Sequence, residues 1–184
     1  MVTGQFAAGG GGSLTLELLR LLPQFLTGLR LVSALLLWWL VTSLEFQSAL
    51  ICLGFAILSD AVDGSLVRRF GVPSRAGAYF DATADFAVVA AAFSAFAHLE
   101  IYPTWLVALI ALAFLVFILS SIVTPMIYDP IGRHIGGILF VATAATLLLH
   151  DFLVQSVILS VATGSLGMTL GARTAYVLAA YRHL

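Results

Sequence analysis

The sequence predicts an all-α integral membrane protein with six transmembrane helices, preceded by a short amphipathic helix at the membrane surface. Of its 184 residues, 61% are hydrophobic and 9% are charged, whereas a soluble domain carries about 25% charged residues. Segments 101–128 and 152–172 contain no charged residue. Each is long enough to cross a hydrocarbon core of about 30 Å as a helix.

The chain divides into a tail and one membrane domain. Residues 1–13 include the glycine-rich run "AAGGGGS" and are expected to form a flexible tail, while residues 14–184 form a single domain. Segment 14–22 ("LTLELLRLL") is too short to span a bilayer and suits the membrane surface. The six spans are expected at 24–43, 46–69, 74–98, 103–128, 131–150 and 152–181. Because the connections are short, neighbouring spans should be antiparallel.

The basic residues predict the orientation of these spans. All eight are arginines, and they occur near the first span, at the second and fourth connections and towards the C-terminus. The other connections contain acidic residues and histidines instead. By the positive-inside rule, both termini are cytoplasmic, and Arg173 and Arg182 are expected to anchor the chain at that surface. A net charge of −1, without a basic stripe, excludes nucleic acid as a partner.

Four of the nine acidic residues lie on the two spans that flank the second connection. Asp60 and Asp63 are three residues apart, which places them about 60° from each other around a helix. Asp81 and Asp85 are four apart on the next span and share one face. Two antiparallel helices can therefore direct four carboxylates into one volume near the cytoplasmic surface. Divalent cations would neutralise that charge, because carboxylate oxygens are natural ligands of Mg²⁺, Mn²⁺ and Ca²⁺.

Two non-enzymatic interpretations of the aspartates are open at this point. In the first, Arg68 and Arg75 balance the carboxylates in a purely structural helix seam. The cost of burying charge at membrane depth, about 2.5–3.5 kcal/mol per residue, argues against it. In the second, the aspartates line a path for cations or protons. The outer halves of the spans contain no matching polar relay, which argues against transport.

The stretch from residue 60 to residue 85 resembles a family signature. It reads Asp60-x2-Asp63-Gly64-x2-Val67-Arg68-x8-Gly77-x3-Asp81-x3-Asp85. It is similar to D-x2-D-G-x2-A-R-x8-G-x3-D-x3-D, the motif of the CDP-alcohol phosphotransferases, and matches seven of eight fixed positions, with Val67 in place of Ala. Residues 23–30 ("PQFLTGLR") also resemble the family's opening P-N-x-x-T-x-x-R, with Gln24 in place of Asn. The family would have six membrane helices after a short surface helix.

The resemblance implies transfer of a phosphatidyl group from a CDP-lipid, usually CDP-diacylglycerol, to an alcohol, with release of CMP. It implies two divalent cations, Mg²⁺ or Mn²⁺, which neutralise phosphate charge and align the nucleophile. One would be held by Asp60, Asp63 and Asp81, and the other by Asp60, Asp81 and Asp85. Asp85 would also be the general base. The positions that match CDP-lipid contacts are Gln24, Thr27, Gly64, Arg68, Ser74 and Gly77. The resemblance further implies a homodimer. The orientation predicted from the arginines places the active site on the cytoplasmic side of the cell membrane.

Three arginines are candidates for binding the acceptor: Arg75, Arg133 and Arg30. They favour a small phosphorylated polyol, either glycerol 3-phosphate or inositol 1-phosphate. Segment 74–85 resembles inositol-phosphate-type synthases, in which an arginine at the position of Arg75 would hold the acceptor phosphate. The alternative is a neutral acceptor such as serine, with these arginines serving only as membrane anchors.

Segment 66–92 is also similar to glycerophosphate-type synthases. Those enzymes usually contain D-P-x-A-D-K, where this chain has Ala82 in place of proline and Phe86 in place of lysine. The missing lysine removes one contact for an anionic acceptor. Together with Val67, it raises the further alternative of a family member that binds its substrates without turning them over.

Overall fold

The computed structural model describes residues 28–70, 75–123 and 132–181. This part of the chain is entirely helical, which confirms the predicted all-α class. A first helix is followed by five more: Gly28–Thr42, then α2 (Phe46–Phe70), α3 (Arg75–His98), α4 (Thr104–Val123), α5 (Gly132–Leu148) and α6 (Phe152–Tyr181). The tail at 1–13, the expected surface helix at 14–22 and the site residues Gln24 and Thr27 lie outside the described residues.

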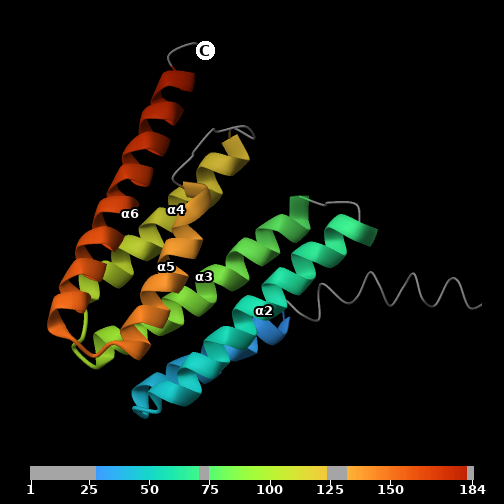
Figure 1. Cartoon of the computed structure of the whole chain (residues 1–184). Coiled ribbons are helices and arrows are strands. Elements are labelled where there is room, and N and C mark those ends of the chain that lie inside the picture. The colour runs from blue at the N-terminus through green and yellow to red at the C-terminus, as the bar shows by residue number, and fades with distance from the viewer. Residues whose placement is uncertain (1–27, 71–74, 124–131, 182–184) are drawn as a thin grey trace, which may run out of the picture.

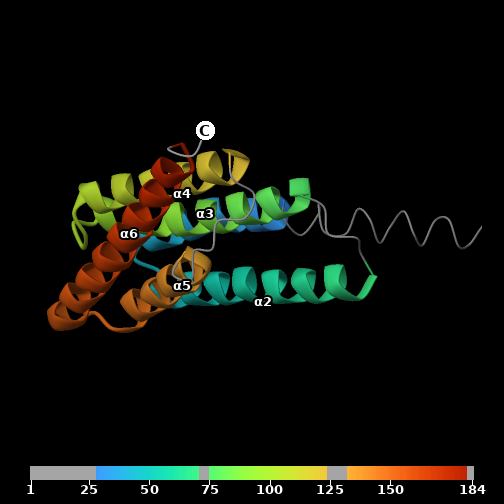
Figure 2. The same cartoon turned by 90° about the horizontal axis from the view of Figure 1, so that it is seen from above.

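Successive helices alternate in direction, as the short connections predicted. The described connections 43–45, 99–103 and 149–151 all lie at one end of the bundle (Figure 1). α3 packs against α4 and α5, and α6 packs against α4 and α5. Seen from above, α6 crosses α3 obliquely (Figure 2). α3 and α6 spread apart towards their ends away from the described connections (Figure 1).

The helix ends have identifiable local causes. Leu44 and Glu100 adopt left-handed backbone conformations, with φ of 63° and 61°. After the first helix, the amide of Glu45 donates to the carbonyl of Leu40 at 2.9 Å, and the same pattern ends α3, where Ile101 donates to Phe96 at 2.9 Å. These are Schellman motifs, which satisfy the last carbonyls of a helix while reversing the chain.

α6 begins at a capping residue. The Asp151 carboxylate accepts a hydrogen bond from the amide of Leu153 at 2.8 Å. A carboxylate at this position satisfies a backbone donor that has no partner within the helix. The sequence "HDF" thus contains both the end of the fifth predicted span and the start of the sixth.

The core is built on the middle of α3. Val88, Ala92, Phe93 and Phe96 are each at most 1% exposed. Tyr102, in the connection after α3, packs its ring against both phenylalanines, with ring centroids 5.6 Å and 5.9 Å away. This aromatic cluster holds the connected ends of α3 and α4 in place, so that the other half of α3 is positioned to line a site.

The outer surface of the bundle is apolar. Large side chains such as Leu35, Phe55 and Leu153 are 74%, 68% and 71% exposed, which is expected only where lipid replaces water. Three segments are long and apolar enough to cross a membrane: Tyr79–His98, Thr104–Ser121 and Phe152–Tyr176. The other described apolar helices are shorter: Gly28–Thr42, Phe46–Ser59 and His134–Leu148. The chain is therefore an integral membrane protein, while six spans and cytoplasmic termini stay predictions.

Candidate active site

The described part of the site is centred on Asp85, in α3. Arg30, on the first helix, donates a hydrogen bond from Nη1 to Oδ1 of Asp85 at 2.9 Å, which is also a salt bridge. The Arg30 side chain is 0% exposed, whereas that of Asp85 is 33% exposed. The pair joins two helices whose residues are 55 positions apart in the chain. A charged hydrogen bond of this kind is shorter and stronger than a neutral one.

Asp81 lies one helical turn before Asp85 and is half-buried. The spacing of four along α3 puts both carboxylates on the same face of this helix, as the sequence predicted. α3 thus contributes two of the four expected metal ligands side by side.

The remaining predicted site residues fall where the structure does not describe side chains. Asp60, Asp63, Gly64 and Arg68 are within α2, Arg75 and Gly77 are within α3, and Arg133 is within α5. Ser74 lies outside the described residues. Among the side chains that the structure does describe, no group of three potential metal ligands comes together. The complete ligand set therefore stays a prediction.

The donor set itself fits a hard divalent cation. Asp81 and Asp85 supply carboxylate oxygens only, and the motif adds two more aspartates on α2. Oxygen-only donors suit Mg²⁺ or Mn²⁺ rather than zinc or copper. When bound, such cations would supply neutralisation of the phosphate charges of a nucleotide-linked substrate.

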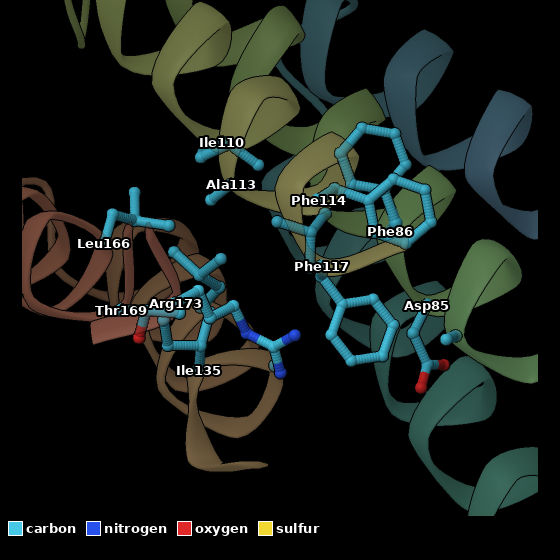
Figure 3. A pocket seen from close by; sticks show the side chains of 14 residues that line it. Asp85, Phe86, Ile110, Ala113, Phe114, Phe117, Ile135, Leu166, Thr169 and Arg173 are labelled. Atoms are coloured by element: carbon cyan, nitrogen blue, oxygen red, sulfur yellow. The ribbon is translucent and has the colours of Figure 1, made fainter. Parts of the chain in front are cut away.

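A cavity of about 290 Å³ lies beside Asp85, between α3, α4, α5 and α6. Asp85 and Arg173 both line it, and most of the remaining wall is apolar (Figure 3). Ile110 and Ala113 contribute from α4, and Leu166 from α6. The cavity therefore has an acidic group from α3 and a basic group from α6 on an otherwise apolar lining.

One wall of the cavity is aromatic. The Phe86 ring stacks on the Phe114 ring, with centroids 4.0 Å apart and planes 6° from parallel. Phe114 is followed by Phe117, with ring centroids 6.2 Å apart. Phe86, which stands where the glycerophosphate-type synthases usually have lysine, is thus part of the packing between α3 and α4.

Arg173 is the residue that sequence reasoning missed. We expected it to be a surface anchor, and that prediction is wrong: its side chain is 5% exposed, inside the bundle. Nη1 donates to Oγ of Ser120 at 2.6 Å, and the guanidinium carbon lies 4.7 Å from the centroid of the Phe117 ring. The positive-inside rule describes connections, whereas Arg173 is eight residues before the end of α6.

A weak signal for this placement exists in the sequence. Leu166, Thr169 and Arg173 follow at spacings of three and four, which puts them on one face of α6. Leu166 is 0% exposed and Thr169 is 3% exposed, so this face points inward. Thr169 lines the cavity, and its hydroxyl has no hydrogen-bond partner among the described residues.

The described part of this integral membrane protein thus combines Asp81 and Asp85 on α3 with a buried guanidinium on α6, and Asp85 and Arg173 line one cavity. The family model for CDP-alcohol phosphatidyltransferase matches residues 20–173. The match covers most of the chain, including Arg30, all four aspartates and Arg173, and the chain belongs to the CDP-alcohol phosphatidyltransferase family. A search of curated proteins finds no match to it.

Membership confirms the predicted resemblance and the predicted enzyme class. Enzymes of this family transfer a phosphatidyl group from a CDP-alcohol to an acceptor. The structural seam and the cation path, which the aspartates alone left open, are therefore not needed to explain the buried charge. Membership does not determine the acceptor.

Proposed function

We propose that this protein transfers the phosphatidyl group of CDP-diacylglycerol to the hydroxyl of a phosphorylated polyol, glycerol 3-phosphate or inositol 1-phosphate, and releases CMP. One observation carries the proposal: the Asp85 carboxylate and the buried Arg173 guanidinium line the same cavity. A carboxylate can accept a proton from an alcohol, and a guanidinium can bind a phosphate through several N–H donors. The two groups suit the two ends of a phosphorylated polyol.

In the proposed reaction, Asp85 takes the proton of the acceptor hydroxyl. The acceptor oxygen then attacks the phosphorus that carries the diacylglycerol, the bond from this phosphorus to the oxygen of CMP breaks, and CMP leaves with that electron pair. Such a transfer depends mostly on positioning and on stabilising charge. Asp60, Asp63, Asp81 and Asp85 would hold the two divalent cations, Mg²⁺ or Mn²⁺, which supply charge neutralisation at the diphosphate.

Arg173 is held in an orientation suited to an anion. A guanidinium has five N–H donors in a plane, and Ser120 accepts from one of its nitrogens. Contact with the Phe117 ring adds a cation–π interaction that restrains the plane. We include Arg173 with Arg75 and Arg133 as an acceptor-binding residue.

For the donor, we retain the positions that match the family motif: Gln24, Thr27, Gly64, Arg68, Ser74 and Gly77. The distribution of arginines supports a site that faces the cytoplasm. The family resemblance supports a homodimer. In this arrangement the acyl chains of the donor stay in the bilayer while its diphosphate meets a water-soluble acceptor.

The aromatic wall favours a second candidate acceptor. Phe86, Phe114 and Phe117 present apolar surface to the cavity. Burying this surface against an apolar group lowers the free energy of binding more than burying it against a polyol does. A lipid alcohol with an anionic group could place its apolar part against these rings and its charge at Arg173.

CMP release by the detergent-purified protein tests these alternatives. The assay would contain CDP-diacylglycerol, Mg²⁺ or Mn²⁺, and one acceptor at a time: glycerol 3-phosphate, inositol 1-phosphate, serine, phosphatidylglycerol as a lipid alcohol, or water. We expect release to depend on a phosphorylated polyol and to be lost in Asp85→Asn. Release that depends only on serine or only on the lipid alcohol would reject the polyol. If no acceptor supports release, cation flux in vesicles would separate an inactive family member from a transporter.

A further inference from the structure

The ion pair between Arg30 and Asp85 is asymmetric. The Arg30 side chain is 0% exposed, and a third of the Asp85 side chain is exposed, where it lines the cavity. The guanidinium is thus enclosed by the protein, and the carboxylate is the member of the pair that an acceptor can reach.

The position of Arg30 is set by the helix on which it lies. Arg30, Ala34, Leu37 and Val41 follow at spacings of four, three and four, and all are at most 4% exposed. The three apolar members anchor the inward face of the first helix against the core. They therefore hold the fourth member, Arg30, in a fixed register opposite α3.

Stability alone is a poor reason for a guanidinium in this place. Removing a cation from water costs several kcal/mol even after relaxation, and replacing a buried ion pair with apolar side chains is often neutral or stabilising. A leucine or methionine at position 30 would continue the apolar stripe of the first helix. An apolar residue at position 30 would leave the Asp85 carboxylate without this charged partner, so the arginine is best explained by what it does for that carboxylate.

An arginine at this position can restrain the orientation of the Asp85 carboxylate. Its contact at Oδ1, at 2.9 Å, opposes rotation of the carboxylate about the bond to Cβ. A planar guanidinium restrains the direction of such a contact better than an ammonium group does. A general base is effective only when its oxygen is within hydrogen-bond reach of the proton that it removes.

We propose that Arg30 is a positioning residue for Asp85: it orients the carboxylate towards the cavity so that the acceptor hydroxyl meets a fixed base. This inference rests on the proposed function, because it takes Asp85 as the group that receives the proton. It replaces the acceptor contact that the sequence suggested for Arg30, since a fully buried guanidinium offers no surface to an acceptor.

Four variants test this role. Arg30→Met removes the charge but keeps an apolar chain of similar length, and Arg30→Lys keeps the charge without the planar group. Ser33→Ala is the matched control, because Ser33 lies one turn along the same helix and its hydroxyl donates to the backbone carbonyls of Leu29 and Arg30. Asp85→Asn tests the base itself.

The measurements are kcat and acceptor KM from CMP release, and Mn²⁺ binding by electron paramagnetic resonance in the absence of turnover. For Arg30→Met we expect kcat to fall by about 10- to 100-fold, the range typical of residues that orient a metal-ligating side chain, with acceptor KM changed by less than about threefold. Mn²⁺ should bind at least as tightly as it binds the wild type, because the substitution removes a positive charge that repels the metal ion. Arg30→Lys should fall between Arg30→Met and the wild type, and Ser33→Ala should match the wild type.

Three results would overturn the inference. An unchanged kcat in Arg30→Met, with Asp85→Asn inactive, would remove the positioning role and leave the proposed function intact. A large rise in acceptor KM at constant kcat would make Arg30 an acceptor contact after all. Parallel loss of kcat and Mn²⁺ binding would mean a structural role.

Two further outcomes complete the test. Full activity of Asp85→Asn would instead reject the proposed function, because no base would be needed at that position. If Arg30→Met does not purify in a folded form, kcat of Arg30→Lys is compared with that of the wild type instead. An unchanged kcat in Arg30→Lys would then overturn the inference.

Discussion

The guanidinium of Arg173 lies 4.7 Å from the centre of the Phe117 ring, on the wall of the cavity that Asp85 also lines. A carboxylate and a guanidinium from residues almost ninety positions apart in the sequence thus line the same cavity. This arrangement leads to predictions about binding, packing, pH dependence and metal dependence.

The first prediction concerns Arg173. If it binds the acceptor anion, Arg173→Met removes a charge-assisted hydrogen bond worth about 1.5–3 kcal/mol. Acceptor KM should rise by about 10- to 100-fold, while kcat changes less. Steady-state CMP release over a range of acceptor concentrations measures both. Arg182→Met, at the other arginine expected to be an anchor, is the control and should keep the wild-type KM. An unchanged KM in Arg173→Met would argue for a packing role.

The second prediction concerns the aromatic wall. Phe86→Leu keeps most of the apolar volume but loses the stacked contact with Phe114, which contributes about 0.5–1.5 kcal/mol. Phe86→Ala also leaves a void, so its total loss should be about 3 kcal/mol, the lower end of the range for phenylalanine, because Phe86 is only partly buried. Thermal unfolding in detergent should rank the wild type above Phe86→Leu and Phe86→Ala lowest. Equal stability of the leucine and alanine variants would show that the side chain is not part of the packing between α3 and α4.

The third prediction concerns the connection between α3 and α4. The Tyr102 hydroxyl is 2.8 Å from Oγ1 of Thr146. Because that hydroxyl of Thr146 donates to the carbonyl of Ala142, Tyr102 is the donor. Tyr102→Phe should lower the free energy of unfolding by about 1 kcal/mol. Thr146→Val should show non-additive coupling with it in a double-mutant cycle.

This hydrogen bond also predicts a pH dependence. Burial raises the pKa of the Tyr102 hydroxyl. The unfolded chain therefore ionises first, near pH 10, and the contribution of Tyr102 is complete below that pH and lost as the pH rises through the folded pKa. The difference in stability between the wild type and Tyr102→Phe should shrink above about pH 10. A constant difference across that range would contradict the burial of the hydroxyl.

The fourth prediction concerns metal dependence. If the four aspartates come together as we propose, they repel one another and the diphosphate of the donor, so removal of divalent cations with EDTA should abolish CMP release. Mg²⁺ or Mn²⁺ should restore it, whereas Zn²⁺ should not, because oxygen-only donors do not favour it. Asp85→Asn should stay inactive at every metal concentration. Undiminished release in EDTA would contradict the metal-dependent chemistry.

The helices and their order can be predicted from the sequence. Apolar runs separated by short polar connections predicted five described helices to within a few residues at most ends, and the first helix, described from Gly28, ends one residue before its predicted limit. The pairing of Asp81 with Asp85 on one face of α3 also followed from local spacing. These features depend on interactions between residues a few positions apart in the chain, and the spacing of such residues can be read from the sequence.

Which helix faces meet depends on contacts between residues that are far apart in the chain. Arg30 and Asp85 are 55 residues apart, and Arg173 and Ser120 are 53 apart. In a soluble helix an apolar stripe marks the buried face. Here, apolar residues face lipid as well as protein: Leu166 is 0% exposed and Met168, two residues later, is 64% exposed. Hydrophobicity therefore does not distinguish the inner face of a helix from the outer one. The sequence alone could not show that Arg173 lies on the inner face of α6, because its burial depends on the packing of α4 against α6.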